Sequence, residues 1–190
     1  NSGALYVAKP ASCGRIVPTL DGKLIDEAGN DVPNSGVGEL CVRGTVVIKG
    51  YLNREESTAE AIQDGWFRTG DIATIDDDGY VFIVDRAKDM VLRGGENIYC
   101  SEVETAIYQH EAVAEAAVFG VPDDRLGEVV GVAIVLTPGA SLDIAGLREF
   151  LAPTLAKFTI PEHIWFLGEP RPRNANGKFL KRELRESLTA

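Results

Sequence analysis

Short apolar segments separated by glycine dominate residues 1–85, a spacing that is typical of strands joined by tight turns. Within residues 40–47 the apolar positions alternate loosely, so we expect Cys41, Val42 and the pair Val46–Val47 to face a core. The glycines that separate the segments are Gly22, Gly29, Gly36, Gly38, Gly44, Gly50, Gly65, Gly70 and Gly79. The pattern predicts a β-rich first part of the chain.

Two local signals add detail to this part. The tripeptide Asp77–Gly79 lies between the apolar segments 72–75 and 80–84, which predicts a β-hairpin turn. Ser57 and Glu60 have the spacing of a capping box, in which the two side chains satisfy the first N–H groups of a helix. One short helix is therefore expected to follow Ser57.

Residues 86–190 contain both apolar residues at helical spacing and apolar runs of strand length. Ser101 and Glu104 form a second capping box ahead of apolar residues at helical spacing, whereas the apolar runs 116–121 and 129–136 have the length of strands. This part of the chain is predicted to open with a helix and continue into two strands.

Three further elements are expected before the end of the chain. Ser141 is placed to cap a helix, and residues 164–167 form a short strand-like run. The helix after Ser141 has the apolar stripe Ile144, Leu147, Phe150 and Leu151, and a closing helix has the stripe Leu180, Leu184 and Leu188. The order hairpin, helix, strand, strand, helix, strand, helix suits a small mixed α+β domain. Charged residues replace the strand pattern at 85–88, so we expect the domain boundary there.

Composition fits a globular chain. Its 190 residues, 45% apolar and 25% charged, suit one large or two small domains. Cys13, Cys41 and Cys100 are an odd, widely spaced set, which argues against a disulfide framework and against zinc and indicates a reducing cytoplasm. No apolar run is long enough to span a bilayer, and no export signal opens the chain. A cytoplasmic protein without a transmembrane segment is predicted.

Charge is distributed unevenly along the chain. The net charge is −10, yet residues 171–190 carry six basic side chains against Glu183 and Glu186. An acidic protein with one basic tail is a poor nucleic-acid binder. The tail is either a solvated amphipathic helix or a site for a small anion such as a nucleotide phosphate.

Two motifs about a hundred residues apart carry the candidate chemistry. The first is Gly-Trp-Phe-Arg-Thr-Gly-Asp over residues 65–71, followed by Asp-Arg-Ala-Lys-Asp over 85–89, and the second is Pro-Arg-Asn-Ala-Asn-Gly-Lys over 172–178. In this order they resemble the carboxyl-terminal third of the adenylate-forming superfamily, which comprises acyl-CoA synthetases, adenylation domains and luciferases. The resemblance runs from about Gly14 to Leu188.

This resemblance implies a domain organisation. Residues 1–85 resemble the end of the large amino-terminal AMP-binding domain, chiefly its β-barrel-like subdomain, and residues 86–190 resemble the small mobile carboxyl-terminal domain. The family's Ser/Thr/Gly-rich phosphate loop has no counterpart in residues 1–64. Together with a start at Asn1 rather than Met, this leads us to expect a fragment that is inactive alone and needs the remainder of the amino-terminal domain.

The resemblance also implies the nucleotide-binding residues. A carboxylate has two oxygens that can each accept a hydrogen bond from one of the two ribose hydroxyls. In the family, the aspartate at Asp71 holds the ribose of ATP, the arginine at Arg86 also reaches it, and Lys88 is the hinge of the small domain. Without the family pattern, Asp71 would be read as a solvated acid in a turn, and Lys88 as part of a charged linker.

The loop Gly94–Gly95 and the basic tail supply the other sites. In the family this loop meets the pantetheine of CoA, and the residue at Cys100 is usually proline, so the chain departs from the pattern there. Lys157 is a candidate for binding the CoA phosphates, and the basic residues of the tail are an alternative. In the family the lysine at the position of Lys178 stabilises charge as the carboxylate attacks the α-phosphate, and the alternative for Lys178 is an ordinary surface lysine.

The function implied is that of a fatty-acid–CoA ligase. ATP activates a carboxylic acid as acyl-AMP, and the CoA thiol then displaces AMP. Mg²⁺ is an expected cofactor whose ligand belongs to the part upstream of residue 1, and no metal site is expected in the chain itself. Three alternatives remain: an enzyme that loads a carrier protein, an aryl-CoA ligase, and a non-catalytic module that binds a nucleotide or a partner.

Overall fold

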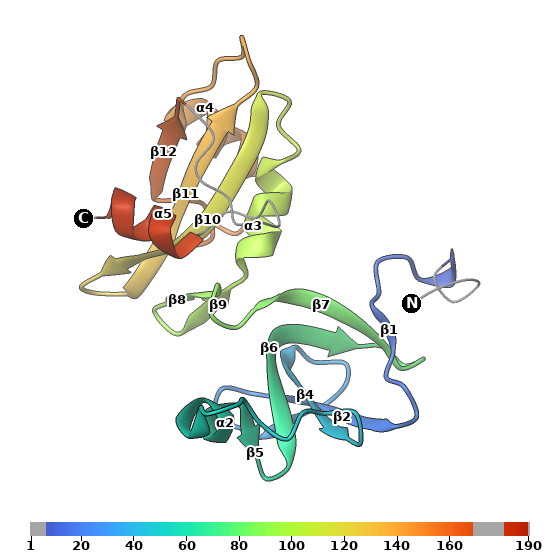
Figure 1. Cartoon of the computed structure of the whole chain (residues 1–190). Helices are drawn as coiled ribbons and strands as arrows, with labels where there is room; N and C mark the ends of the chain where they lie inside the picture. The colour runs from blue at the N-terminus through green and yellow to red at the C-terminus, as the bar shows by residue number, and fades with distance from the viewer. Residues whose placement is uncertain (1–6, 169–180, 190) are drawn as a thin grey trace. The chain divides into compact units, whose positions relative to one another are not determined.

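The computed structural model describes residues 7–168 and 181–189, and its fold is the expected mixture of strands with few helices (Figure 1). The chain divides into two compact units, Asn1–Lys88 and Asp89–Ala190. Each unit has its own sheet and its own buried core.

The first unit is an antiparallel sheet with the strand order β1-β7-β6-β4-β2-β3. Strand β5 also pairs with β6. Its elements are β1 (Gly14–Arg15), β2 (Leu20–Ile25), β3 (Asp31–Val32), β4 (Gly38–Gly44), α2 (Glu55–Ala61), β5 (Ile62–Gln63), β6 (Trp66–Ile75) and β7 (Tyr80–Arg86). Apolar side chains from the central strands form the core, namely Leu24, Leu40, Ala73, Ile75 and Val81. Cys41 is buried as expected, but Val46 is exposed because β4 ends at Gly44, so that expectation was wrong.

The predicted hairpin between β6 and β7 is confirmed. Asp76 closes its loop, because the Asp76 N–H donates to Tyr80 O at 3.0 Å and Asp76 Oδ1 accepts from Tyr80 N–H at 2.9 Å. Gly79 takes a φ of +80°, a conformation that glycine adopts without steric cost. Lys9 pairs with Asp76 and, at 2.7 Å, with Asp78, so the turn is tied to the segment before β1.

The second unit is a mixed sheet with helices on both faces. Its elements are β8 (Val91–Arg93), β9 (Glu96–Ile98), α3 (Cys100–Ile107), β10 (Val113–Asp123), β11 (Gly127–Leu136), α4 (Ile144–Leu151), β12 (His163–Leu167) and α5 (Lys181–Leu188). The sheet order is β10-β11-β8-β9, and β12 runs parallel to β11. From α3 to α5 the elements follow the predicted order of helix, strand, strand, helix, strand and helix, whereas the β8–β9 hairpin ahead of α3 was not predicted.

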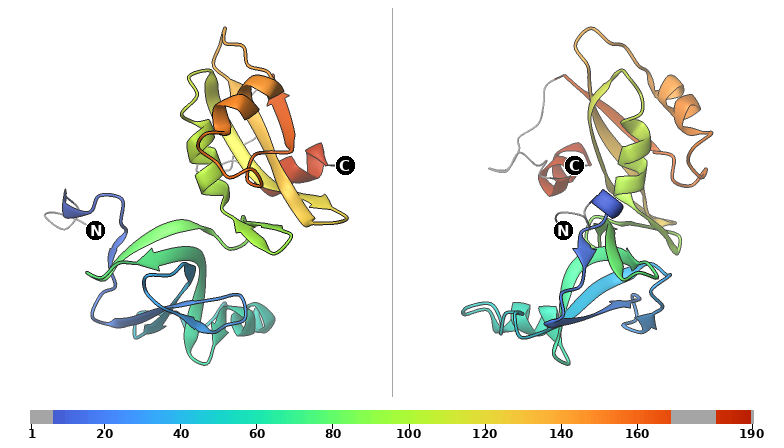
Figure 2. Two further views of the ribbon diagram at one scale, coloured as in Figure 1. Left: turned by 180° about the vertical axis from the view of Figure 1, so that it is seen from behind. Right: turned by 90° about the vertical axis from the view of Figure 1, so that its right-hand side faces the viewer.

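Alternate residues of β10 and β11 face opposite sides of this sheet, as the two-residue period of a strand requires. Ala116, Val118, Val132 and Ile134 pack with α3 and α4, whereas the neighbours on the other face pack with Leu184 of α5. The right-hand view of Figure 2 shows α4 and α5 on opposite sides of the sheet. The unit therefore has two apolar layers, one on each face of a shared sheet.

Helix α3 also covers the outer edge of β10. Glu104 Oε1 accepts the Val118 N–H at 2.9 Å, and the Tyr108 hydroxyl accepts the Ala116 N–H at 3.1 Å. Unpaired edge groups are sites for unwanted pairing with another chain, and native proteins often cover them in this way. Lys181 of α5 completes the cluster with an ion pair to Glu104 at 2.7 Å.

Both expected capping boxes were wrong. Ser57 and Ser101 lie inside α2 and α3, whose N-cap residues are Arg54 and Tyr99 and make no side-chain cap bond. In α3 the competing interaction is clear, because the carboxylate of Glu104 is taken up by β10 and α5 and does not serve the start of its own helix.

The cap of α4 lies two residues beyond the expected serine. Asp143, not Ser141, is the N-cap, and its Oδ1 accepts the Gly146 N–H at 2.7 Å. Aspartate and serine are about equally good caps, so composition alone did not distinguish them. Of the predicted stripe in α4, Leu147 and Leu151 are buried.

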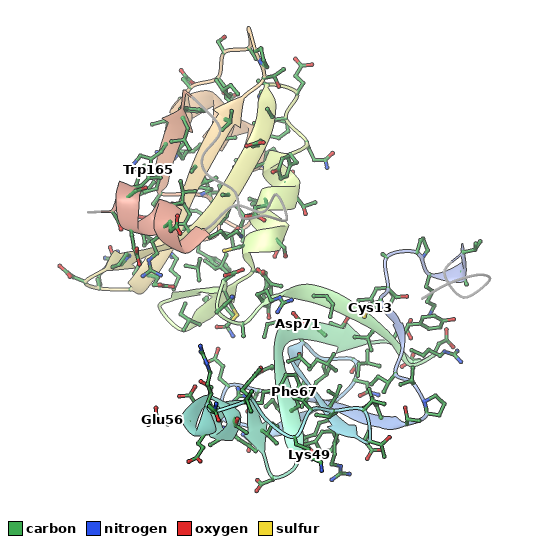
Figure 3. The ribbon with its side chains drawn as sticks, in the orientation of Figure 1. Cys13, Lys49, Glu56, Phe67, Asp71 and Trp165 are labelled. Carbon is green, nitrogen blue, oxygen red and sulfur yellow. The ribbon has the colours of Figure 1, made fainter. Side chains whose placement is uncertain are left out.

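Each unit holds one of the two tryptophans of the chain. Trp66 opens β6 and has Lys23 Nζ and Arg43 Cζ over its ring, 4.9 and 4.5 Å from the centroid. Trp165, labelled in Figure 3, lies in β12 of the second unit. The first ring is in a cationic surface environment and the second belongs to an aromatic stack.

Gly131 makes room for that stack at the centre of the sheet. The ring of Trp165 lies between those of Phe119 and His163, with centroid distances of 5.7 and 5.6 Å. A Cβ at Gly131 would lie 2.5 Å from Val121 Cγ2 and 3.1 Å from Trp165 Cζ3. The missing side chain is therefore what lets the aromatic rings on β10 and β12 approach each other across β11.

We predict that Gly131→Ala destabilises the second unit by about 1–3 kcal/mol, the usual cost of overpacking a filled core. Gly168→Ala is the matched control, because a Cβ there meets no atom within 4 Å. Urea unfolding of both variants measures the difference. Equal stability of the two variants would show that the stack adjusts freely to an added methyl group.

Candidate functional site

The motif Thr-Gly-Asp forms a bulge in β6. The register on either side leaves the single residue Leu40 of β4 opposite the three residues 69–71 of β6. Gly70 has a φ of +72°, which a β-branched or bulky residue would adopt only with strain. Bulges are frequent beside active sites because they redirect a side chain away from the regular pleat. Figure 3 shows Asp71 near the middle of β6, where this strand runs beside β7.

A buried carboxylate holds the bulge in place. Glu39 of β4 is 8% exposed, and its Oε1 accepts the Gly70 N–H at 3.1 Å. Its Oε2 accepts Arg68 Nε at 2.9 Å and also pairs with Arg68 Nη2. This contact raises the pKa of Arg68, since the carboxylate favours the charged guanidinium. Burial, and then the Glu39 charge, raise the pKa of the neighbouring Cys41 thiol.

The Thr69 side chain adds a second attachment. Its hydroxyl donates to Leu40 O at 2.7 Å and accepts the Asp71 N–H at 3.1 Å. The Ala87 N–H donates to Gly70 O at 2.9 Å, so the bulge is also joined to the end of β7. The backbone that carries Asp71 is thus fixed from both neighbouring strands.

Asp71 and Arg86 lie directly opposite each other on β6 and β7. Arg86 Nε is 2.7 Å from Asp71 Oδ1, with the arginine side chain 55% and the aspartate side chain 23% exposed. Among the described residues no donor is aligned for a hydrogen bond with the buried Asp71 Oδ1, so the contact is an ion pair only. The arrangement leaves a fixed carboxylate with acceptor capacity for the hydroxyls of a ligand, beside a partly exposed guanidinium.

The remaining predicted site residues lie elsewhere. Lys88 is exposed in a turn and is the last residue of the first unit. Lys157 is exposed between α4 and β12. Lys178 lies outside the described residues.

Gly94 and Gly95 form a two-residue hairpin turn between β8 and β9. Arg93 pairs with Glu96 on either side of it, and the glycines have φ values of +59° and +92°. Two successive positive φ values define a type I′ turn, which matches the twist of the strands it joins. A side chain at Gly95 would meet no atom within 4 Å, so space remains beside the turn. Cys100, which follows β9, donates its Sγ–H to Asp89 O at 2.7 Å.

Sequence reasoning missed Glu39 altogether. Its only local signal was an acidic residue within an otherwise apolar strand, from Gly38 to Val42. Such a residue is almost never fully buried without a partner. The identity of that partner, 29 residues away in Arg68, depends on strand pairing and not on local sequence.

Comparisons with known proteins settle the family. The model of the AMP-binding enzyme matches residues 3–52, and the model of the AMP-binding enzyme C-terminal domain matches residues 102–178. The chain belongs to the AMP-binding enzymes, which are the adenylate-forming superfamily. The chain spans about a third of the length of the curated relatives it matches, and it includes the match to the C-terminal domain of the family.

Those relatives are ligases of several kinds. The fatty acid–[acyl-carrier-protein] ligase ScoC of Streptomyces coeruleorubidus is 42% identical over 175 residues, which are 92% of this chain and 34% of that protein. The long-chain-fatty-acid–CoA ligase of Salmonella typhimurium is 43% identical over 175 residues, 92% of this chain and 31% of that protein. The two differ in acceptor at nearly equal identity, so similarity alone does not choose between CoA and a carrier protein.

A solved AMP-binding enzyme has the same fold over nearly all of this chain. It is the o-succinylbenzoate CoA synthetase MenE of Bacillus subtilis, in complex with an acyl-adenylate. Its TM-score is 0.83 and its identity 34%, with 95% of this chain and 37% of that chain covered.

Among the described residues no helix is long and apolar enough to cross a membrane. Within the same part of the chain no group of three His, Cys, Asp or Glu side chains could hold a metal ion.

We predict that Glu39→Gln lowers the free energy of unfolding of the first unit by about 1–3 kcal/mol. The change leaves a partly buried guanidinium without its charged partner. Asp21→Asn is the control, because it breaks the exposed Arg43–Asp21 ion pair at 3.0 Å, and such changes usually stay within about 0.5 kcal/mol. Urea unfolding measures both. If Glu39→Gln costs no more than the control, the carboxylate does not hold the bulge.

Proposed function

We propose that this chain is the carboxyl-terminal portion of an ATP-dependent acid–thiol ligase, with its boundary between two domains near residues 85–88. Such an enzyme converts a carboxylic acid to acyl-AMP and then transfers the acyl group to the thiol of CoA. The observation that carries the proposal is the Asp71–Arg86 pair, held on a bulge and with an unsatisfied buried carboxylate oxygen. Family membership supports the general chemistry.

In this proposal Asp71 binds the ribose of the nucleotide. Its two oxygens accept hydrogen bonds from the adjacent 2′ and 3′ hydroxyls, which are two donors on one rigid ring. Arg86, whose guanidinium is half exposed, reaches the same sugar. Since Glu39 and Thr69 fix the bulge before any ligand arrives, little ordering is left for the binding step.

Lys178 acts in the first half-reaction. When a carboxylate attacks the α-phosphate of ATP, two anions approach each other, and negative charge increases on the phosphoryl oxygens. A lysine ammonium is a compact charge on a long side chain and lowers the energy of that transition state. The assignment comes from the sequence motif at residues 172–178.

The second half-reaction uses the other predicted sites. Rotation about Lys88 brings the turn Gly94–Gly95 to the adenylate, where its backbone meets the pantetheine arm of CoA. Lys157, exposed beside the sheet of the second unit, contacts the CoA phosphates. Hinges are a few positions at the ends of elements that absorb a large φ/ψ change, and the turn that contains Lys88 is of this kind.

A fatty acid is our first candidate substrate, and CoA our first candidate acceptor. Relatives named for fatty acids, for ferulate and for 2-succinylbenzoate lie at 42–47% identity, and one of them loads an acyl carrier protein. Pyrophosphate release by the full-length enzyme with each of the three acids will identify the substrate, and CoA and a carrier protein can then be compared as acceptors. Mg²⁺ bound by the upstream part of the enzyme, and a cytoplasmic location, complete the proposal.

We predict that Lys178→Ala in the full-length enzyme slows acyl-adenylate formation by roughly 10²–10³-fold, the usual loss for one preorganised transition-state donor. Thioester formation from supplied acyl-adenylate should persist, since the lysine acts in the first step only. Pyrophosphate exchange and CoA consumption measure the two steps, and Lys49→Ala, at another exposed lysine, is the control. Adenylation within a few-fold of wild type would make Lys178 an ordinary surface lysine.

We predict that Lys88→Pro in the full-length enzyme spares adenylate formation and impairs thioester formation. Proline fixes φ near −65° and so obstructs rotation about this residue. Lys88→Ala removes the same side chain but keeps the rotation, and it should retain both steps. An equal loss of both half-reactions in the proline variant would exclude Lys88 as the hinge.

A further inference from the structure

The β8–β9 hairpin, which carries the Gly94–Gly95 turn, has few backbone bonds to the rest of its unit. Each of its strands has three residues, and the pairing with β11 consists of Arg93 opposite Gly127. Within the described residues two other bonds support it: Gly94 N–H donates to Leu126 O at 2.8 Å, and Leu92 N–H donates to a side chain, Glu128 Oε2, at 3.2 Å. A two-stranded hairpin is marginally stable alone, so side chains have to fix its position.

Glu162 provides a fixed point for such a side chain. It lies just before β12, and its N–H donates to Val130 O of β11 at 2.8 Å. Its carbonyl oxygen accepts Arg148 Nη2 of α4 at 2.8 Å, and Arg148 Nε donates to Pro161 O at 3.3 Å. The backbone of Glu162 is therefore held from the sheet and from a helix, and only its carboxylate is left to act on a neighbour.

That carboxylate binds the residue next to the turn. Arg93 Nη2 is 2.6 Å from Glu162 Oε1, and Arg93 immediately precedes Gly94. The arginine side chain is 21% exposed, and its buried Nε has no hydrogen-bond partner among the described residues. The position of this mostly buried guanidinium depends on its one strong contact, because burying an unpaired charge destabilises the folded state.

We propose that the Arg93–Glu162 ion pair is a positioning device for the thioester-forming step. It fixes the β8–β9 turn against the sheet, so that the Gly94–Gly95 backbone is presented to CoA in one place. Arg93 and Glu162 are positioning residues and do not take part in bond making. The inference rests on the proposed function, in which this turn meets the pantetheine arm.

The test uses the full-length enzyme with its two half-reactions measured separately. Glu162→Gln should raise the KM for CoA by about fivefold, the upper end for a partly exposed ion pair. Acyl-adenylate formation and the KM for ATP should stay within twofold of wild type. Arg93→Gln should have the same effect, and the Arg93→Gln/Glu162→Gln double variant should be no worse than either single variant, because both changes remove one interaction.

Two measurements separate this inference from the proposed function. Asp21→Asn breaks an exposed ion pair in the first unit and should leave the KM for CoA unchanged. Thioester formation from acyl-adenylate and CoA by the unaltered full-length enzyme tests the proposed function itself, whatever the role of Glu162.

The outcomes are distinct. Thioester formation by the unaltered enzyme with no effect of Glu162→Gln on the KM for CoA would overturn the inference and leave the proposed function standing. No thioester formation by the unaltered enzyme would overturn both the inference and the proposed function. An equal loss of both half-reactions in Glu162→Gln, with a lowered Tm, would show a purely structural ion pair and would also overturn the inference.

Discussion

The candidate site of the first unit depends on one buried charge. Glu39 lies in the apolar segment Gly38–Val42 of β4, and both of its oxygens hold β6 out of its regular register. A regular ladder would alternate Thr69, Gly70 and Asp71 between the two faces of the sheet. The bulge instead gives Asp71 a fixed position opposite Arg86. The desolvation cost of burying the Glu39 carboxylate is offset by its charged and backbone donors. These same contacts give the site its shape.

Much of the fold could be predicted from the sequence because its signals were local. The hairpin at Asp77–Gly79 and the long strands β10 and β11 follow from turn residues and apolar runs. Helix starts were predicted poorly, since a capping box assumes that a glutamate serves its own helix, and Glu104 instead serves another strand and another helix. Local spacing contains no information about such remote partners.

The candidate functional site could be predicted only in part from the sequence. The family resemblance identified Asp71 and Arg86 as candidates, and in the structure Arg86 Nε lies 2.7 Å from Asp71 Oδ1. The supporting residues could not be found that way: Glu39, Arg93 and Glu162 act through contacts 29 and 69 residues apart in the sequence. Such pairs follow from the packing of segments far apart in the sequence, which a local reading of spacing does not reveal. Roles that depend on ligands, such as those of Lys88 and Lys157, stay predictions.

The distribution of the two tryptophans has an optical consequence. Trp66 lies in the first unit under two cations, and Trp165 lies in the second between two stacked rings. Replacing either one with phenylalanine leaves an indole in one unit only, and its fluorescence can be excited selectively over that of the tyrosines, without an attached dye. Denaturation followed through each remaining indole would then show whether the two units lose structure in one cooperative transition or in two separate ones.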